Sequence, residues 1–208
     1  MRVQAWAGQA LRFLGVELCI RGTPPAGGPL LIVANHISWL DIVVLHAARH
    51  CRFVSKDAVR NWPLVGTLAT GAGTLYVKRS SSRDAMRVVQ RMTLALQVGD
   101  ILAVFPEGTT GDGTNLLPFH ANLLQAAIAA GAPVLPVALR YTEGRPERRS
   151  RAVSYVGDES LVGSLWRTVS AQGLRAHVCF GATQDAQGRD RRSWARDLRS
   201  DIERLRQA

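Results

Sequence analysis

Short apolar runs alternate with longer amphipathic segments along most of the chain. The runs at residues 30–34, 101–105 and 134–138 contain no charge and are rich in branched side chains, which is typical of strands buried on both faces. The segments at 82–98 and 191–206 repeat apolar residues every three or four positions, which predicts amphipathic helices. This alternation predicts an α/β fold in which helices cover a largely parallel, twisted sheet.

Weaker patterns complete the predicted fold. We expect a helix ending near residue 50, a helix at 119–130, and strands near 51–54, 152–156 and 176–180. At 208 residues the chain has the length of one ordinary domain, so we expect residues 1–208 to form a single domain.

The N-terminal segment, residues 1–15, predicts a short amphipathic helix with Trp6, Ala10, Phe13 and Leu14 on one side. Polar residues interrupt its apolar stretch, so it does not form the core of a signal peptide. Two roles remain open for this helix: anchoring at a membrane interface, or packing against the domain. The chain has no apolar run of about 18 residues, and we therefore expect no transmembrane helix.

The first chemical motif follows the apolar run at 30–34. There the sequence Asn-His-Ile-Ser-Trp-Leu-Asp occupies residues 35–41, and Ser38 with Asp41 forms a capping-box pattern that predicts a helix start. On a continuous helix His36 and Asp41 would lie about 140° apart, so they meet only if His36 belongs to the preceding loop. In that arrangement Asp41 holds one imidazole nitrogen and leaves the other free to act as a base. The alternative is that Asp41 merely caps the helix.

A second polar segment ends the apolar run at 101–105. It reads Pro-Glu-Gly-Thr-Thr-Gly-Asp-Gly over residues 106–113, where the glycines permit unusual backbone angles. Glu107 lies at the carboxyl end of its predicted strand, the same sheet edge at which His36 is expected. An ordinary turn explains this segment when it is considered alone. Two polar strand ends in one small chain favour a shared site over two unrelated turns.

Together these segments resemble the glycerolipid acyltransferase family, which includes 1-acylglycerol-3-phosphate acyltransferase. The family's N-H-x-S-x-x-D block, an HX4D motif, is matched at 35–41, and its F-P-E-G-T block at 105–109. The family's lysine-led segment with a P-x-x-G turn is matched by Lys56, Pro63 and Gly66. Its strand ending in arginine is matched at 73–79, and its V-x-P-V-like strand at 134–138. Order and spacing agree over residues 30–140, which we expect to form the catalytic region.

The resemblance implies acyl transfer from a thioester to the hydroxyl of a lysolipid. His36 would take the proton of the acceptor hydroxyl, and Asp41 would fix the imidazole tautomer and stabilise the imidazolium. The expected substrate-binding residues are Asn35, Ser38, Lys56, Arg79, Glu107, Gly108 and Thr109. Backbone N–H groups would meet the oxyanion, in the turn at 107–111 or at the helix start after Ser38. No metal and no bound cofactor are implied, because acyl-CoA or acyl carrier protein serves as a co-substrate.

Departures from the family pattern bear on the acceptor. Phosphatidate-forming members often have arginine after F-P-E-G-T, whereas this chain has Thr110, which cannot bind a phosphate as a guanidinium does. The lysine-led segment also lacks its usual acid and leucine, since Lys56 is followed by Asp-Ala-Val. The expected acceptor is 1-acylglycerol-3-phosphate, giving phosphatidic acid, with Arg79 and Lys56 as the cations for its phosphate. Lyso-ornithine lipid or another lysophospholipid is the alternative acceptor.

Charge and cysteine content indicate where the protein acts. The formal net charge is +10, which favours an anionic membrane surface, and no nucleic-acid-binding motif is present, so we expect no nucleic acid partner. The three cysteines are widely scattered, which disfavours a disulfide framework and fits a reducing cytoplasm. A peripheral or monotopic protein on the cytoplasmic face of the inner membrane is expected. A lipid-modifying enzyme must reach its substrate in the bilayer, which favours the membrane-interface role for residues 1–15.

Two other hypotheses make different predictions. A thioesterase-like hydrolase on the same scaffold would admit water where the acceptor alcohol binds, and its hydrolysis rate would not respond to lysolipid. A non-enzymatic, basic membrane-surface protein that binds lipid would keep its function in the variant His36→Ala. Neither hypothesis explains why both motif blocks occur together.

Overall fold

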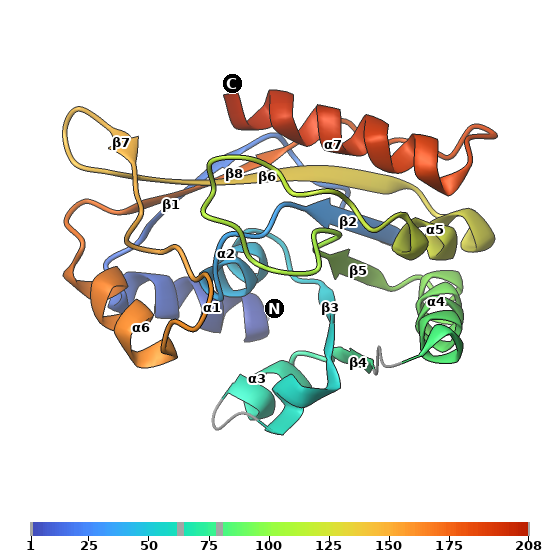
Figure 1. Ribbon diagram of the computed structural model, residues 1–208, viewed down its shortest axis with the longest axis horizontal. Coiled ribbons are helices and arrows are strands. Elements are labelled where there is room, and N and C mark those ends of the chain that lie inside the picture. Colours follow the sequence, from blue (N-terminus) through green and yellow to red (C-terminus); the bar gives the residue numbers. More distant parts are fainter. Residues whose placement is uncertain (1, 62–64, 78–80, 208) are drawn as a thin grey trace.

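A mixed sheet of eight strands forms the centre of the computed structural model, which describes residues 2–61, 65–77 and 81–207 (Figure 1). The strands are β1 (Glu17–Arg21), β2 (Leu30–Ala34), β3 (Arg52–Lys56), β4 (Leu75–Val77), β5 (Ile101–Val104), β6 (Val134–Glu143), β7 (Arg148–Arg149) and β8 (Arg175–Phe180). The α-helices are α1 (Arg2–Phe13), α2 (Leu40–Ala48), α3 (Val65–Gly71), α4 (Ser82–Gln97), α5 (Leu124–Ala130), α6 (Leu161–Ser170) and α7 (Arg191–Gln207). Two 3₁₀ turns, η1 (Asp57–Asn61) and η2 (Ala121–Leu123), complete the described elements.

The strand order explains where a site can form. The sheet runs β1-β8-β6-β2-β5-β3-β4, with β7 paired to β6. Strands β6, β2, β5, β3 and β4 are parallel to one another, whereas β8 runs antiparallel to β6 and parallel to β1. The carboxyl ends of five strands therefore share one edge of the sheet, and loops from that edge meet there.

Strand β2 shows why the sheet is buried on both faces. All five of its side chains are fully buried, and they alternate between two apolar clusters. Leu31 and Val33 face the cluster built with α4, α5 and α7, while Leu30, Ile32 and Ala34 face the cluster built with α1 and α2. A strand between two helical layers needs apolar residues at every position, which is why 30–34 contains no polar residue.

Most predicted elements are confirmed, with the fold class, and some boundaries are wrong. The helices expected at 82–98 and 191–206 are α4 and α7, and the strand expected at 176–180 is β8. The predicted helix at 119–130 begins only at Ala121, as a 3₁₀ turn. The predicted strand at 152–156 is wrong, because these residues form a turn and a coil that pass beside the two motif loops. Loop-to-loop hydrogen bonds hold this segment, which no periodicity reveals.

The N-terminal helix packs against the domain on one side and exposes apolar side chains on the other. Helix α1 packs on α2 through Ala7 and Leu11, which are almost fully buried, and the Gln4 amide donates to the carbonyl of Ala47. Its outer side leaves Phe13 91% exposed and Trp6 40% exposed. In the part of the chain that the structure describes, no helix has the length and apolarity needed to cross a bilayer.

Candidate active site

The two motif blocks meet at the carboxyl ends of β2 and β5. These strands pair in parallel, with Val33 opposite Val104, so the residues that follow each strand emerge side by side. Residues 35–39 and 105–119 then form two loops above this edge (Figure 1). The expectation that both segments contribute to one place in the molecule is confirmed.

His36 and Asp41 form a hydrogen-bonded pair. His36 lies in the loop before α2, and its Nδ1 is 2.8 Å from Oδ2 of Asp41, which sits in the first turn of the helix. The loop folds back over this turn, as the five-residue spacing requires. Because a carboxylate only accepts, the neutral form of this imidazole carries its proton on Nδ1 and keeps a free lone pair on Nε2.

The Asp41 carboxylate is fully buried and receives three further hydrogen bonds. Its Oδ2 accepts from the backbone N–H of Ile37 at 2.6 Å and of Ser38 at 2.9 Å. Its Oδ1 accepts from the phenol of Tyr141 at 2.7 Å. Burial and the Asp41 charge raise the pKa of Tyr141 well above 10, so this phenol remains a donor. Four donors offset the desolvation of a buried negative charge and fix the carboxylate in one orientation.

Helix α2 begins one residue later than Ser38 as cap residue predicts. The helix begins at Leu40 with Trp39 as its cap residue, and the Ser38 hydroxyl accepts from the N–H of Leu40 at 3.3 Å. The reciprocal half of the predicted capping box is present, since Asp41 accepts from the N–H of Ser38. Asp41 thus caps the chain and holds His36 at once, so the two alternatives drawn from sequence coexist.

The imidazole of His36 is held by one stacking contact and one hydrogen bond. The imidazole stacks on Phe105 with ring centroids 3.9 Å apart and an interplanar angle of 6°. Its side chain is 18% exposed, and no described residue hydrogen-bonds to Nε2. The stack and the bond to Asp41 together leave the ring little rotational freedom. A base held this way is oriented before any substrate arrives.

Glu107 ties the two motif loops together. Its Oε1 accepts from the backbone N–H of His36, and its Oε2 accepts from that of Leu117, both at 2.8 Å. The side chain is 5% exposed, and burial raises the pKa of Glu107 against the opposing effect of these two N–H donors. Each carboxylate oxygen is therefore already engaged with backbone.

The turn after Glu107 packs closely against His120. Gly108 has φ +73°, and a Cβ there would lie 2.9 Å from Cδ2 of His120, so no larger residue fits without a shift. The N–H of Gly111 donates to the carbonyl of His36 at 2.9 Å. Thr109 is exposed, while the hydroxyl of Thr110 donates to the carbonyl of Tyr155. This turn is anchored on the histidine loop at one end and leaves Thr109 open to solvent.

Asn35 lies beneath the site and faces inward. Its side chain is 1% exposed, its Nδ2 donates to the carbonyl of Leu139 at 3.1 Å, and its Oδ1 accepts from the N–H of Leu139 at 2.7 Å. Ser38 is likewise fully buried. The Asn35 side chain thus takes the place of a backbone hydrogen-bond partner between the end of β2 and the longer strand β6.

Of the two predicted cations, Lys56 is described only by its backbone and Arg79 is not described. Lys56 ends β3 at the same sheet edge as β2 and β5, although the placement of its side chain is not described. Arg79 and Pro63 lie outside the described residues. Among the residues that the structure does describe, no group of three His, Cys, Asp or Glu side chains is arranged to hold a metal ion.

The residues that support the His36–Asp41 pair lie outside the motifs identified in the sequence. Tyr141 and Leu139 belong to β6, about 100 residues from the histidine motif, and Leu117 serves through its backbone alone. A tyrosine in an apolar strand gives one usable signal, because a buried phenol needs a partner. The identity of that partner depends on strand order, which the local pattern does not contain.

Comparisons with known proteins agree with this geometry. A family model described as Acyltransferase matches residues 17–140. The chain is 40% identical to a 1-acyl-sn-glycerol-3-phosphate acyltransferase of Neisseria meningitidis, over 83% of this chain and 67% of that protein. It is 37% identical to a lyso-ornithine lipid O-acyltransferase of Pseudomonas aeruginosa, over 95% of this chain and 75% of that protein.

A solved structure shares the fold. The crystal structure of the 1-acyl-sn-glycerophosphate acyltransferase PlsC from Thermotoga maritima superposes with a TM-score of 0.69 and covers 98% of this chain and 78% of that one. The two chains are 20% identical, so this match supports the architecture alone.

Proposed function

The chain belongs to the acyltransferase family, and we propose that it moves a fatty acyl group from a thioester to the free hydroxyl of a lysolipid. The observation that carries this proposal is the His36–Asp41 pair, which leaves Nε2 of His36 free beside the carboxyl ends of β2 and β5. The names of the two similar acyltransferases supply the class of acceptor, because both act on lysolipids.

The proposed reaction needs no covalent enzyme intermediate. Nε2 of His36 takes the proton of the acceptor hydroxyl while the hydroxyl oxygen attacks the thioester carbonyl carbon. A tetrahedral oxyanion forms, the C–S bond then breaks, and the imidazolium returns its proton to the departing sulfur. Base catalysis of this kind contributes about 10²–10⁴-fold, and the thioester is already activated. Backbone N–H groups of the turn at 107–111 are the proposed donors to the oxyanion, apart from those of Gly108 and Gly111, which donate to the carbonyls of Phe105 and His36.

Asp41 acts through His36 in this proposal. It keeps the proton on Nδ1 so that Nε2 can accept, and its charge stabilises the imidazolium that forms after proton transfer. Tyr141 and the N–H groups of Ile37 and Ser38 hold the carboxylate in place. We infer that they position Asp41 without contacting substrate.

The remaining predicted site residues differ in how deeply they are buried, and this suggests different roles for them. Asn35, Ser38 and Glu107 are buried and bonded to backbone, so we infer that they set the shape of the two loops. Gly108 and Thr109 belong to the turn beside His36, and we propose that this turn contacts the glycerol or headgroup of the acceptor. Lys56 and Arg79 stay as the proposed cations for an acceptor phosphate.

The acceptor is proposed to be 1-acylglycerol-3-phosphate, with phosphatidic acid as the product. The 40% identity to the Neisseria enzyme supports this choice. One observation favours lyso-ornithine lipid as a second candidate: Thr110 offers no guanidinium, and its hydroxyl is bonded to the carbonyl of Tyr155. The similar Pseudomonas enzyme, whose name gives that acceptor, covers 95% of this chain.

The donor and the place of action are further parts of the proposal. An acyl-CoA or acyl carrier protein thioester supplies the acyl group, and the net charge of +10 supports binding to an anionic membrane surface. We propose the cytoplasmic face of the inner membrane, with α1 exposing Trp6 and Phe13 toward it.

The test is acyl transfer from labelled acyl-CoA and labelled acyl carrier protein to paired acceptors. Lysophosphatidic acid and lyso-ornithine lipid are compared at equal concentration, and thioester hydrolysis without acceptor is measured alongside. A higher kcat/KM for lysophosphatidic acid supports phosphatidate synthesis. A higher value for lyso-ornithine lipid moves the assignment to the second candidate. Hydrolysis that is unchanged by either acceptor, with no acylated product, would overturn the proposal.

A further inference from the structure

Helix α6 carries an apolar stripe that no described residue covers. Val162, Leu165, Trp166 and Val169 are 77%, 40%, 72% and 44% exposed, respectively. Their spacing of three, four and seven residues puts them on one side of the helix. An exposed tryptophan between two exposed valines is unusual for a helix that faces only water.

The opposite side of α6 is fixed beside the proposed active site. Ser164 and Thr168 are fully buried there, and the indole N–H of Trp39, inside the histidine motif, donates to the Ser164 hydroxyl at 3.1 Å. The segment leading into the helix is joined to the same loop, because the N–H of Tyr155 donates to the carbonyl of Ile37 at 3.3 Å. The apolar stripe therefore has a fixed position relative to His36.

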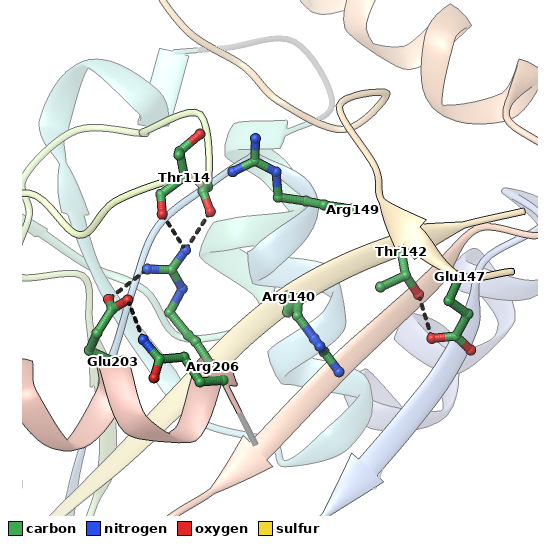
Figure 2. A pocket seen from close by; sticks show the side chains of 9 residues that line it. Thr114, Arg140, Thr142, Glu147, Arg149, Glu203 and Arg206 are labelled. Atoms are coloured by element: carbon green, nitrogen blue, oxygen red, sulfur yellow. Dashed lines mark hydrogen bonds and ion pairs between the residues drawn. The ribbon is translucent and has the colours of Figure 1, made fainter.

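A basic hairpin lies at the same end of the molecule as α6 (Figure 1). Residues 145–151 contain four exposed arginines, Arg145, Arg148, Arg149 and Arg151. Glu147, the acidic residue within this hairpin, is bonded to Arg175 on β8, and Asp112 interacts electrostatically with Arg149 and Arg151. Figure 2 shows Arg149 at the rim of a cleft of about 380 Å³ that Arg140 also lines, and no hydrogen bond or ion pair joins either guanidinium to a described residue. The four arginines of the hairpin outnumber these two carboxylates, so this end of the molecule presents an excess of positive charge.

From these features we infer that α6 is a membrane-docking helix and that its partner is an anionic lipid bilayer. The stripe Val162, Leu165, Trp166 and Val169 enters the boundary between headgroups and acyl chains, while the arginines of 145–151 meet anionic headgroups. This inference rests on the proposed function, because a lysolipid acceptor resides in the bilayer. Through Trp39 and Tyr155, docking of α6 brings the histidine loop to the surface where the acceptor lies.

The charge pattern favours a bilayer over a second copy of the chain. Apolar stripes alone fit either partner, but a copy of this chain would bring a second cluster of 145–151 arginines to a symmetric interface. Like charges at such an interface disfavour association. Anionic headgroups complement the same arginines, and a tryptophan next to an apolar stripe is typical of interfacial helices.

Vesicle co-sedimentation tests this inference with a matched pair of variants. The double substitution Val162→Ser with Trp166→Ser removes the most exposed part of the stripe. The α4 control is Met86→Ser with Val98→Ser, on the other layer of the molecule; Met86 on α4 is 73% exposed and Val98, the residue that caps α4, is 80% exposed. Vesicles contain phosphatidylethanolamine with or without phosphatidylglycerol, and thermal unfolding verifies that both variants are folded.

The expected result is selective. The α6 variant binds phosphatidylglycerol vesicles at least tenfold more weakly than the unmodified chain, and the α4 control stays within twofold. Replacing Arg148 and Arg149 by glutamine lowers binding to these vesicles and leaves binding to neutral vesicles unchanged. Equal vesicle binding by the α6 variant and the α4 control would overturn the inference. So would a dimer, seen by sedimentation velocity, that the α6 variant alone abolishes.

Activity measurements separate this inference from the proposed function. With acceptor presented in vesicles, the α6 variant should lose activity in proportion to its lost binding. With a short-chain lysolipid below its micelle concentration, its kcat should change less than threefold. Vesicle binding that depends on α6 while no acceptor is ever acylated would contradict the proposed function and leave the docking helix supported.

Discussion

The phenolic O–H of Tyr141 donates a 2.7 Å hydrogen bond to Oδ1 of Asp41, although 100 residues separate the two positions. The other oxygen of that carboxylate holds Nδ1 of His36. Strand β6 thereby supports the orientation of the proposed base from the far side of the motif. The histidine block is thus completed by a residue that lies outside every motif read from the sequence.

Replacing Tyr141 with phenylalanine should weaken both stability and turnover. The substitution leaves Oδ1 of the buried Asp41 without its donor, which costs about 1.5–3 kcal/mol for a hydrogen bond to a charged group. The free energy of unfolding, measured with urea, should fall by roughly that amount. In steady-state assays kcat should fall while KM changes little, because Tyr141 does not contact the acceptor. Full activity in a destabilised variant would mean that Tyr141 supports the fold alone.

The variant Asp41→Asn tests the tautomer argument. An amide can donate to Nδ1, which favours the tautomer with the proton on Nε2 and removes the free lone pair. By analogy with the triad of serine proteases, activity should fall by about 10³–10⁴-fold. The control is Asp185→Asn, an exposed carboxylate far along the chain. A loss of less than tenfold at Asp41 would show that this carboxylate does not control the imidazole.

Glu107 should act by positioning. The amide of Glu107→Gln can accept through only one end, so the N–H of either His36 or Leu117 loses its acceptor. We expect a loss of about 1–3 kcal/mol in the free energy of unfolding, together with reduced kcat. Glu17→Gln is the matched control, since the Glu17 side chain is 65% exposed. Unchanged stability and turnover in the Glu107 variant would refute the role as a link between the loops.

The residue at 110 should influence the choice of acceptor. In the variant Thr110→Arg a guanidinium can bind a phosphate bidentately, which should raise the kcat/KM ratio for lysophosphatidic acid over lyso-ornithine lipid. A gain of about 1.4 kcal/mol corresponds to tenfold. Thr110→Val removes the bond to the Tyr155 carbonyl without adding charge, and should leave the ratio within twofold. An unchanged ratio in the arginine variant would show that position 110 is remote from the headgroup.

The buried imidazole of His46 should make stability depend on pH. Burial, with a smaller effect of His50, lowers the pKa of His46 from 6.5 to about 4. Between these values the unfolded chain binds more protons than the folded chain, so stability is full above pH 6.5 and is lost as the pH falls toward 4. The loss is on the order of 3 kcal/mol.

Urea unfolding at pH 4.5 and at pH 7.5 measures this difference. His46→Leu should reduce the dependence on pH, because the leucine side chain does not titrate. Part of the slope should remain, since burial also lowers the pKa of His50. The same slope in the variant and in the unmodified chain would exclude His46 as the cause.

The sequence predicted where the site lies in the fold more accurately than the contacts between its residues. The apolar runs and the two motif blocks placed His36 and Glu107 at the carboxyl ends of two strands on the same sheet edge, and β2 and β5 confirm this. The five-residue spacing also required His36 to lie in the loop before α2. Such inferences succeed because strand periodicity and helix geometry are local properties of the chain.

Contacts between distant segments were not predictable in the same way. Asn35 was expected to contact substrate, yet its amide is bonded to the backbone of Leu139 on β6. Helix α6 was not among the predicted elements, and an amphipathic pattern does not reveal which face of a helix is left without a partner. Such partners depend on strand order and on the path of the loops, which require the folded chain.

The most direct test of the account is acyl transfer by the variant His36→Ala, assayed with the preferred acceptor and with thermal unfolding as a check on folding. His50→Gln serves as the control, because His50 follows the C-terminal end of α2, whereas His36 precedes its start. We expect a loss of about 10²–10⁴-fold in kcat for the alanine variant. The control should keep near-normal activity. Activity of His36→Ala within threefold of the unmodified chain would contradict the claim that His36 is the base.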